Sequence, residues 1–490
     1  MTIAPSAFLA VHPEYERTKH VDELRASEYA RIDAERHAYL DYTGASLAAD
    51  SQLREHLALL QSHVFGNPHS ASPTSATTTM MVERARRHVL EWFHAERDYT
   101  AVFTLNASGA LKLVGEAYPF APDARLLLST DNHNSVNGIR EFACARGATV
   151  DYVPLTYPEL RLDRDHLAVQ LIEGSDVAPD TPRLFAFPAQ SNFTGVRHPL
   201  DIVAMAHAAG WDVLLDAAAY VPTSGLDLRI VQPEFVTVSF YKMFGYPTGV
   251  GCLLVRNDAF PRLHRPWFAG GTVNFATVQA RRHILSPREA GFEDGTLNFL
   301  SIPAVPIGFR HLESIGMDAI GTRVRCLTDW LLSRLVAMRH ANGRPLVRIY
   351  GPVTTEMRGG TVTLNFYDPD GHLVDYRRVE ELAGAERISL RTGCFCNPGA
   401  GETAEWITSE DIEAAVAMGS DMNLPRFLQF ITHRGGKSAG AIRVSLGIVS
   451  NFADVERFLA FADTFRDQTR LAIGAATFDI ESCRVIRDGS

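Results

Sequence analysis

The chain contains 490 residues, of which 46% are hydrophobic and 21% are charged, a composition typical of a globular protein. Its net charge is −10 at pH 7 and no Lys- or Arg-rich block is present, which argues against a nucleic-acid-binding protein. No apolar run reaches the roughly 18 residues that a membrane span needs, so we expect no membrane contact.

The chain begins with a polar stretch and continues with an alternating pattern. Residues 21–36 show helix-like periodicity, and residues 38–48 resemble a short strand and turn. From residue 51 to residue 296, strand-like runs alternate with helix-like runs, which is the pattern of a mostly parallel sheet covered by helices. The strand-like runs are AVFTL, RLLLST, TVDYVPL, RLFAFPA, DVLLDA, FVTVSF and VGCLLV, and the helix-like runs are ALKLVGEAY, VNGIREFACARG and PLDIVAMAHAAG.

The pattern changes after residue 297. Residues 304–340 predict a pair of helices, TVTLNFYD, RISLRTG and AIRVSLGIV predict strands, and residues 452–470 predict a final helix. We therefore predict an α/β fold with a large, doubly wound, mostly parallel sheet domain at 51–296. A smaller α+β domain follows at 297–490, and an N-terminal segment, 1–50, packs with the smaller domain.

Six cysteines are too few for a disulfide framework in a chain of this length, and the N-terminus lacks the basic start of a signal peptide. We therefore expect a cytoplasmic protein. Cys394 and Cys396 lie one residue apart in RTGCFCNPGAGE, where a metal clip, a disulfide, two inert thiols and a nucleophile are the alternatives. The C-x-C spacing differs from the usual zinc spacing and no second pair exists, so we expect no metal site.

Two strand ends carry groups that suit pyridoxal phosphate. Asp216 ends the run VLLD, where a carboxylate faces the ligand crevice of a parallel sheet; a helix N-cap is the alternative. Lys242, one of only four lysines, follows FVTVSF in an apolar and aromatic setting that lowers a lysine pKa and favours a Schiff base. The alternative is a lysine that snorkels from a strand end. Together, the lysine would hold the cofactor aldehyde and the aspartate would keep the ring nitrogen protonated.

A phosphate would need donors, and a turn between a strand and a helix supplies them. The turn contains Asn106, Ala107 and Ser108, and backbone N–H groups at a helix N-terminus bind phosphate well. Ser239 and Tyr241 add hydroxyl groups.

Two further polar residues follow predicted strands. His133 in DNHNSVNGIR would stack on the pyridine ring, and the alternative is an ordinary core or surface histidine. Asn192 in FPAQSNFTG would reach the 3-oxygen of the ring, and the alternative is an Asx-turn.

With these residues in place, the chain resembles fold-type I pyridoxal-phosphate enzymes of the class V aminotransferase type, in the cysteine desulfurase group. Within that group it is most similar to the desulfurase domain of molybdenum cofactor sulfurases. The resemblance runs in family order from about residue 39 to 463. It is carried by YLDYTGASL, GNPHS, FTLNASGALKLVGEAYPF, DNHNSVNGIR, FPAQSNFTG, LLDAAAYVPTSGLDL, SFYKMFGYPTGVGCLLV, FAGGTV, FEDGTLNFL, RTGCFCNPGAG and GAIRVSLGIVSNFADVERFLAF.

The resemblance implies a role for each residue. Lys242 matches the Schiff-base lysine, and Asp216 matches the partner of the ring nitrogen. Thr272 matches a residue that reaches the phosphate of a neighbouring subunit, which implies a homodimer with shared active sites. The other implied roles are ring stacking by His133, an amide near the ring 3-oxygen at Asn192, phosphate binding by Ser108, Ser239 and Tyr241, and substrate-carboxylate binding by Arg443.

The cysteine pair also has a place in the family pattern. R-T-G-x-x-C puts the nucleophile at Cys396, with Cys394 as a neighbouring thiol and Arg391 close enough to lower the thiol pKa. We also predict Arg391 as a substrate-binding residue beside Arg443. The alternative roles are two inert loop thiols and, for Arg443, a charge on a strand surface. The implied reaction converts L-cysteine to L-alanine and leaves a persulfide for a sulfur-acceptor protein or cofactor. The rivals are another pyridoxal-phosphate reaction (C–S lyase, epimerase, aminotransferase or β-substitution) and a non-catalytic sulfur-relay or scaffold protein.

Overall fold

The computed structural model describes most of the chain. The described residues are 5–68, 70–175, 178, 180–417, 426–427, 430–431, 438, 440–469, 476–479 and 484–487. Lys437, the fourth lysine, and Cys483 lie outside them.

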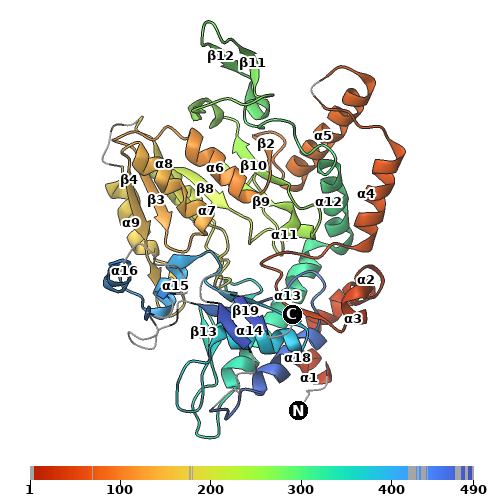
Figure 1. Ribbon diagram of the computed structural model, residues 1–490, viewed down its shortest axis with the longest axis vertical. Helices are drawn as coiled ribbons and strands as arrows, with labels where there is room; N and C mark the ends of the chain where they lie inside the picture. The colour runs from red at the N-terminus through yellow and green to blue at the C-terminus, as the bar shows by residue number, and fades with distance from the viewer. Residues whose placement is uncertain are drawn as a thin grey trace.

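A seven-stranded sheet forms the centre of the larger part (Figure 1). Its strand order is β2-β10-β9-β8-β7-β3-β4, and every pairing except those made by β10 is parallel. The strands are β2 (Tyr99–Thr104), β3 (Arg125–Ser129), β4 (Thr149–Val153), β7 (Arg183–Pro188), β8 (Asp212–Asp216), β9 (Phe235–Ser239) and β10 (Gly251–Arg256).

Both faces of this sheet are buried, which explains why its strands read as continuous apolar runs. Leu126 and Leu128 of β3 pack with α6 and α8 on one face, whereas Leu127 points into the core on the other face. The helices of this part are α4 (Asp50–Ser62), α5 (Pro73–Trp92), α6 (Ala107–Ala117), α7 (Asn134–Asn137), α8 (Ile139–Ala145), α9 (Arg164–Glu173), α10 (Ile202–Ala208) and α11 (Phe240–Phe244).

The smaller part is built on an antiparallel sheet of order β13-β14-β17-β16. Its strands are β13 (Val347–Tyr350), β14 (Thr361–Phe366), β16 (Arg391–Gly393) and β17 (Ala441–Ser445). The predicted helix pair is present, and Gly316 separates its members with a φ of 85° that suits glycine. The helices are α12 (Val305–Ile315), α13 (Met317–Ala337), α14 (Tyr376–Ala385), α15 (Pro398–Glu405), α16 (Ser409–Val416) and α18 (Phe452–Asp463).

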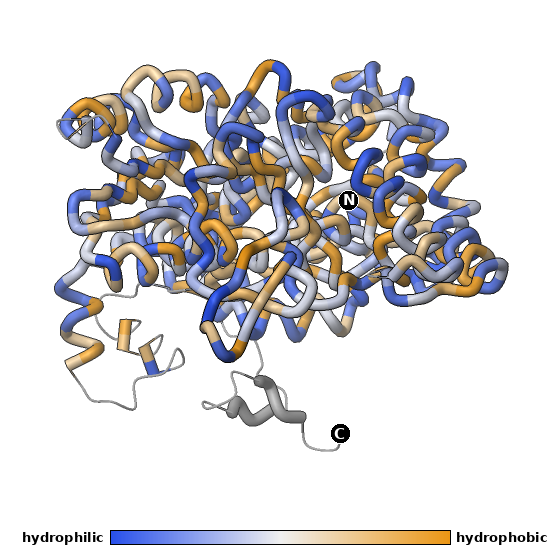
Figure 2. Tube along the Cα trace, turned by 90° about the horizontal axis from the view of Figure 1, so that it is seen from above, coloured by the Kyte–Doolittle hydropathy of each residue, from blue (hydrophilic) through white to orange (hydrophobic). Residues whose placement is uncertain are grey.

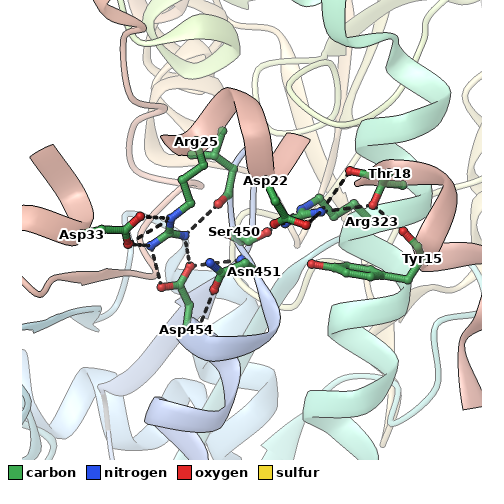
Figure 3. Close-up of polar contacts among 10 residues, drawn as sticks. Tyr15, Thr18, Asp22, Arg25, Asp33, Arg323, Ser450, Asn451 and Asp454 are labelled. Carbon is green, nitrogen blue, oxygen red and sulfur yellow. Dashed lines mark hydrogen bonds and ion pairs between the residues drawn. The ribbon is translucent and has the colours of Figure 1, made fainter. Parts of the chain in front are cut away.

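The N-terminal segment is tied to α13 and α18 by two buried arginines (Figure 3). Arg25 donates to Asp33 and Asp454, and Arg323 binds Asp22 and lies 4.7 Å from the ring centroid of Tyr15. The segment contains α1 (Pro5–Val11), η1 (Pro13–Thr18), α2 (His20–Glu28), α3 (Ala30–Ala34) and β1 (Ala38–Tyr39). The domain boundaries after residues 50 and 296 stay predictions.

A β-hairpin projects from the upper end of the larger part, away from the sheet (Figure 1). It consists of β11 (Val273–Ala276) and β12 (His283–Leu285). The smaller pieces are β5 (Leu155–Thr156), β6 (Arg161–Leu162), β15 (Ile388–Ser389), β18 (Ala476–Asp479), β19 (Arg484–Arg487), η2 (Phe260–Arg262), η3 (Arg288–Gly291) and η4 (Ile302–Ala304).

The predicted fold class is confirmed. Each of the seven predicted strand runs overlaps a strand of the central sheet. One predicted strand is divided: RISLRTG supplies β15, which pairs with β1, and β16, which joins the antiparallel sheet. Apolar and polar residues alternate over short stretches of the chain (Figure 2), and no described helix has the length and apolar character to cross a membrane.

Candidate active site

The predicted cofactor residues converge because four neighbouring parallel strands end at the same edge of the sheet. Asp216 is the last residue of β8 and Ser239 is the last residue of β9. His133 follows β3 and Asn192 follows β7 in the connecting loops. Lys242 lies one turn further along the chain from Ser239, in the short helix α11.

Lys242 lies where a lysine amine is disfavoured as an ammonium ion. Burial lowers its pKa, and the nearby charge of Asp216 opposes this effect only in part. Among the described residues, no hydrogen bond or ion pair to Lys242 is formed. The side chain faces a cavity whose lining includes Ala218 and Gly360. An amine with these properties is a suitable nucleophile for an aldehyde.

Asp216 is buried and has one oxygen engaged. Its Oδ1 accepts hydrogen bonds from the N–H of Ala218 at 3.0 Å and from Thr237 Oγ1 at 3.3 Å. Within the described part of the chain, Oδ2 accepts none. The carboxylate therefore binds the turn after β8 and does not cap a helix, which was the alternative prediction, and one oxygen remains available to a ligand.

His133 begins helix α7 and is fixed by that helix. Its Nδ1 accepts a hydrogen bond from the N–H of Ser135 at 3.1 Å, so the hydrogen of the neutral ring lies on Nε2. Burial lowers the pKa of His133, and the charges of Lys242 and Arg443 act in the same direction, whereas Asp216 opposes them. The ring is therefore held neutral near physiological pH.

The start of helix α6 combines engaged and available donors. Asn106 Oδ1 accepts from the N–H of Gly109 at 3.0 Å, and Ser239 Oγ accepts from the N–H of Ala107 at 2.9 Å. The Ser108 hydroxyl lies 2.6 Å from Ser135 Oγ. The Ser108 N–H has no hydrogen-bond partner within the described residues, as expected for a first-turn donor that awaits an anion.

Tyr241 and Thr272 take different places. Tyr241 lies beside Lys242 on α11, and burial raises the pKa of its hydroxyl. Thr272 is buried at the base of the projecting hairpin, where its Oγ1 donates to Ala269 O and accepts from Ala269 N, both at 2.9 Å. Figure 1 shows this hairpin far from α11 of the same chain.

Asn192 contacts the cysteine segment, which sequence reasoning did not foresee. Its Nδ2 donates to Phe395 O at 2.7 Å, and its Oδ1 accepts from Asn397 Nδ2 at 3.0 Å. One hydrogen of Nδ2 remains for a ligand. The amide therefore joins the end of β7 to the two residues that flank Cys396.

A buried aspartate anchors the same segment. Asp131 Oδ1 accepts from Asn397 Nδ2 at 2.8 Å and from Ser191 Oγ at 2.7 Å, and its Oδ2 lies 3.0 Å from His198 Nε2. All four side chains are almost wholly buried. The available signal in the sequence was the position of Asn397 directly after the second cysteine.

Cys396 is exposed and lies within the electrostatic range of the cofactor residues. Burial lowers the pKa of both Lys242 and Arg443, and a negative charge on the nearby Cys396 would oppose that shift. The carbonyl oxygen of Cys396 accepts from the N–H of Asn134 at 2.7 Å, and both Phe395 and Cys396 have left-handed backbones, with φ of 53° and 54°. Cys394 is half-buried, and both thiols are free. Neither belongs to a potential metal-ligand cluster within the described ranges.

Arg443 and Arg391 meet at one carboxylate. Arg443 Nη2 donates to Asp41 Oδ1 at 3.0 Å, and Arg391 donates to Asp41 Oδ2 from Nε at 3.0 Å and from Nη2 at 2.8 Å. Arg391 therefore binds Asp41, a contact that sequence reasoning did not anticipate. Arg443 is buried, so it is not the charge on a strand surface that was the alternative.

The donors and acceptors that these residues leave without a partner in the part of the chain that the structure describes fit pyridoxal phosphate. A lysine amine without hydrogen bonds suits the aldehyde, and an open Asp216 oxygen suits the ring nitrogen. The Ser108 N–H at a helix start suits the phosphate. Arg443 Nε, buried and without a partner among the described residues, suits an anion beside the cofactor.

Comparisons with known proteins agree with this arrangement. The model of the family described as Aminotransferase class-V matches residues 38–458. The chain is 38% identical to a molybdenum cofactor sulfurase of Arabidopsis thaliana over 486 residues, which cover 90% of this chain and 58% of the relative. It is 37% identical to the human molybdenum cofactor sulfurase over 467 residues, covering 90% and 50%. The chain thus spans only about half the length of these curated relatives.

A solved structure supports the same fold. The apo structure of a cysteine desulfurase from Thermococcus onnurineus NA1 superposes with a TM-score of 0.72 and 21% identity. The match covers 90% of this chain and 97% of that structure.

Proposed function

Because this chain belongs to the class V aminotransferase family and is an enzyme that depends on pyridoxal phosphate, we propose that it is a cysteine desulfurase. It converts L-cysteine to L-alanine and keeps the sulfur as a persulfide on Cys396. The observation that carries the proposal is the exposed thiol of Cys396 between two residues that contact the site. Phe395 accepts a hydrogen bond from Asn192 and its ring centroid lies 4.8 Å from the guanidinium carbon of Arg443, and Asn397 donates to Asn192.

In this proposal the residues of the sheet edge hold the cofactor. Lys242 binds the aldehyde, Asp216 faces the ring nitrogen, and His133 stacks on the ring as a neutral imidazole. The phosphate is bound by the start of α6, at Asn106, Ala107 and Ser108, with the hydroxyl groups of Ser239 and Tyr241. The bound cofactor supplies an electron sink that weakens the bonds around the amino-acid Cα. Asn192 uses its remaining amide hydrogen toward the ring oxygen.

Arg443 receives the substrate carboxylate, which fixes the direction in which the thiol side chain points. A guanidinium binds a carboxylate through two parallel hydrogen bonds, and its buried Nε is a donor without a competing partner among the described residues. The substrate sulfur then lies toward the segment that contains Cys396. The anchoring of this segment by Asn192 and Asn397 keeps the nucleophile at the mouth of the site.

The sulfur-transfer step balances without an external oxidant. The Cys396 thiolate forms a new S–S bond with the substrate sulfur, and the Cβ–S bond breaks. The electron pair of that bond stays with Cβ, which takes up a proton, and the product leaves as L-alanine. The sulfur acceptor, or a thiol reductant in its place, later removes the terminal sulfur from the persulfide, which regenerates Cys396.

We also propose that two chains form a homodimer with shared active sites. Several large apolar side chains around the hairpin are exposed, and a second copy would cover them. Thr272 at the hairpin base would then approach the phosphate in the partner. The exposed side chains are Trp267, Phe268, Phe275, Val278 and Ile284.

The sulfur acceptor and the compartment complete the proposal. The curated relatives are named molybdenum cofactor sulfurases, so a molybdenum cofactor is the acceptor that we propose to test first. A cytoplasmic location agrees with the chemistry, because a free thiol nucleophile requires reducing surroundings.

The main rival is another pyridoxal-phosphate reaction on the same scaffold, such as a C–S lyase reaction. Measuring the release of alanine and sulfide from L-cysteine, with a thiol reductant present, distinguishes the two reactions. The desulfurase produces both in equal amounts, and the Cys396→Ser variant produces neither. Sulfide release without alanine, undiminished in Cys396→Ser, would favour the rival, since a lyase eliminates sulfide directly and does not need this thiol.

A further inference from the structure

Asp41 lies between two guanidinium groups, and this arrangement is not explained by cofactor binding. It follows β1 and forms an isolated parallel bridge with Ser445 at the end of β17. One carboxylate oxygen binds Arg443 and the other binds Arg391. Arg391 and Arg443 are directly opposite each other on β16 and β17, so the sheet register brings the two guanidinium groups to the same carboxylate.

The contacts of Arg443 fix its guanidinium plane on three sides. Nη2 donates to Asp41 Oδ1 and Nη1 donates to Asn192 O, both at 3.0 Å. The guanidinium carbon lies 4.8 Å from the ring centroid of Phe395, the residue before Cys396. Nε is buried and has no partner in the described part of the chain, and Nη2 retains one hydrogen. Nη1 also retains one hydrogen, so three N–H groups remain for an incoming anion.

The charges also favour an incoming carboxylate. Burial lowers the pKa of Arg443, and Asp41 opposes that shift. The hydrogen bonds from Arg391 to Asp41 raise the pKa of Arg391, so both arginines stay charged around a single carboxylate. Two cations and one anion leave a net positive charge. Without Arg391, Asp41 alone would neutralise Arg443.

The backbone at Gly44 packs closely against the contact between Asp41 and Arg391. A Cβ on Gly44 would lie 2.5 Å from Asp41 Oδ2 and 2.7 Å from Arg391 Nη2, closer than atoms can approach. The glycine in the turn after β1 therefore lets the backbone pack directly against the Asp41–Arg391 contact.

We propose that Asp41, held by Arg391, is a positioning residue that directs the open edge of Arg443 toward the substrate carboxylate and so sets the preference for α-amino acids over simple amines. The inference rests on the proposed role of Arg443 in carboxylate binding. It does not require that the enzyme transfers sulfur.

Binding by the holoenzyme tests the proposal without turnover. L-Alanine and ethylamine differ only in the carboxylate, and binding of each is followed by the change in cofactor absorbance. The wild type binds L-alanine more tightly. In Asp41→Asn, this preference falls at least about tenfold, the effect of losing one hydrogen bond between charged groups, while ethylamine affinity stays within about twofold. Asp201→Asn, which removes an exposed aspartate paired with Arg164, leaves the preference unchanged.

A second variant keeps the test decisive if Asp41→Asn fails to fold. Arg391 is half-exposed, and Arg391→Gln leaves Asp41 to neutralise Arg443, so the same preference falls. An unchanged or increased preference in whichever variant folds would overturn the proposal, and so would a wild type that binds both ligands equally. If the wild type prefers L-alanine through Asp41 but releases no alanine from L-cysteine, the inference stands and the proposed desulfurase reaction fails.

Discussion

The backbone N–H of Asn134 donates a hydrogen bond of 2.7 Å to the carbonyl oxygen of Cys396. Asn134 directly follows His133, the proposed ring-stacking residue, so the cofactor site and the proposed nucleophile share a backbone contact. The cysteine segment belongs to the smaller sheet, yet it is fastened to loops of the larger sheet. The position of the proposed nucleophile therefore depends on how firmly this segment is held.

Asn397 tests that attachment. Its Nδ2 donates to Asp131 and Asn192 in a buried network, so Asn397→Ala takes from Asn192 Oδ1 its donor and leaves Asp131 Oδ1 with the Ser191 hydroxyl. We expect the free energy of unfolding to fall by about 1–3 kcal/mol and alanine release to fall with it. Denaturant unfolding and alanine assays provide the measurements. Asn342→Ala, which removes an exposed asparagine bonded to Pro369 O, is the control and should change neither. Equal effects of the two variants would show that the buried hydrogen bonds of Asn397 do not hold the segment.

The lowered pKa of His133 predicts that the stability of the fold depends on pH. Burial lowers its pKa below the ordinary value of 6.5, so the unfolded chain binds more protons than the folded chain as the pH falls below 6.5. The free energy of unfolding therefore decreases as the pH falls below 6.5, and above that pH His133 has no such effect. His133→Gln removes the group. Melting temperatures at about pH 7.5 and 5.5 should differ less in the variant than in the wild type. An identical difference would show that His133 does not titrate in this way.

The N-terminal segment depends on the ion pair between Arg25 and Asp454 (Figure 3). Both side chains are almost fully buried, and Asp454→Ala leaves the Arg25 charge with only the exposed Asp33. We expect the free energy of unfolding to fall by about 3 kcal/mol, because an uncompensated buried charge is costly. Chemical denaturation measures it, with Asp463→Ala, an exposed aspartate of the same helix, as the control. If Asp463→Ala lowered the free energy of unfolding as much as Asp454→Ala does, the stabilising role of the Arg25–Asp454 ion pair would be contradicted.

The hairpin predicts the oligomeric state. Phe275 and Ile284 are exposed on opposite strands of this element, and Val278 lies between them, 92% exposed. Analytical ultracentrifugation should detect a dimer for the wild type. Replacing Phe275 and Ile284 by Glu should shift it toward monomer and lower cofactor retention, since each Thr272 is proposed to serve the other chain. A wild type that sediments as a monomer would refute the shared site.

The sequence was sufficient for the parts of the fold that have a periodic or apolar signal. Each predicted strand of the central sheet overlaps a strand, because strands buried on both faces are continuous apolar runs. The grouping of Asp216 and Lys242 near one sheet edge also followed from their positions at strand ends. Such inferences need only local patterns and the rule that parallel strands end together.

Side-chain partners far apart in the sequence had no such signal. Arg391 and Asp41 are 350 residues apart, and their contact depends on β17, which pairs with β16 and forms an isolated bridge with Asp41. Asn192 likewise binds the cysteine segment across 203 residues. The left-handed backbones of Phe395 and Cys396 could not be inferred either, since neither residue type favours that conformation. These features depend on the packing of two sheets.

The central claim is that Cys396 receives the substrate sulfur, and mass spectrometry of the holoenzyme after a single turnover with L-cysteine measures this directly. Without added reductant, we expect one alanine released for each chain that gains one sulfur atom, with that atom on the peptide containing Cys394 and Cys396. Cys394→Ser should retain the modification and Cys396→Ser should lose it together with alanine release. Alanine formation by Cys396→Ser at the wild-type rate, or the extra sulfur on Cys394 alone, would contradict the account.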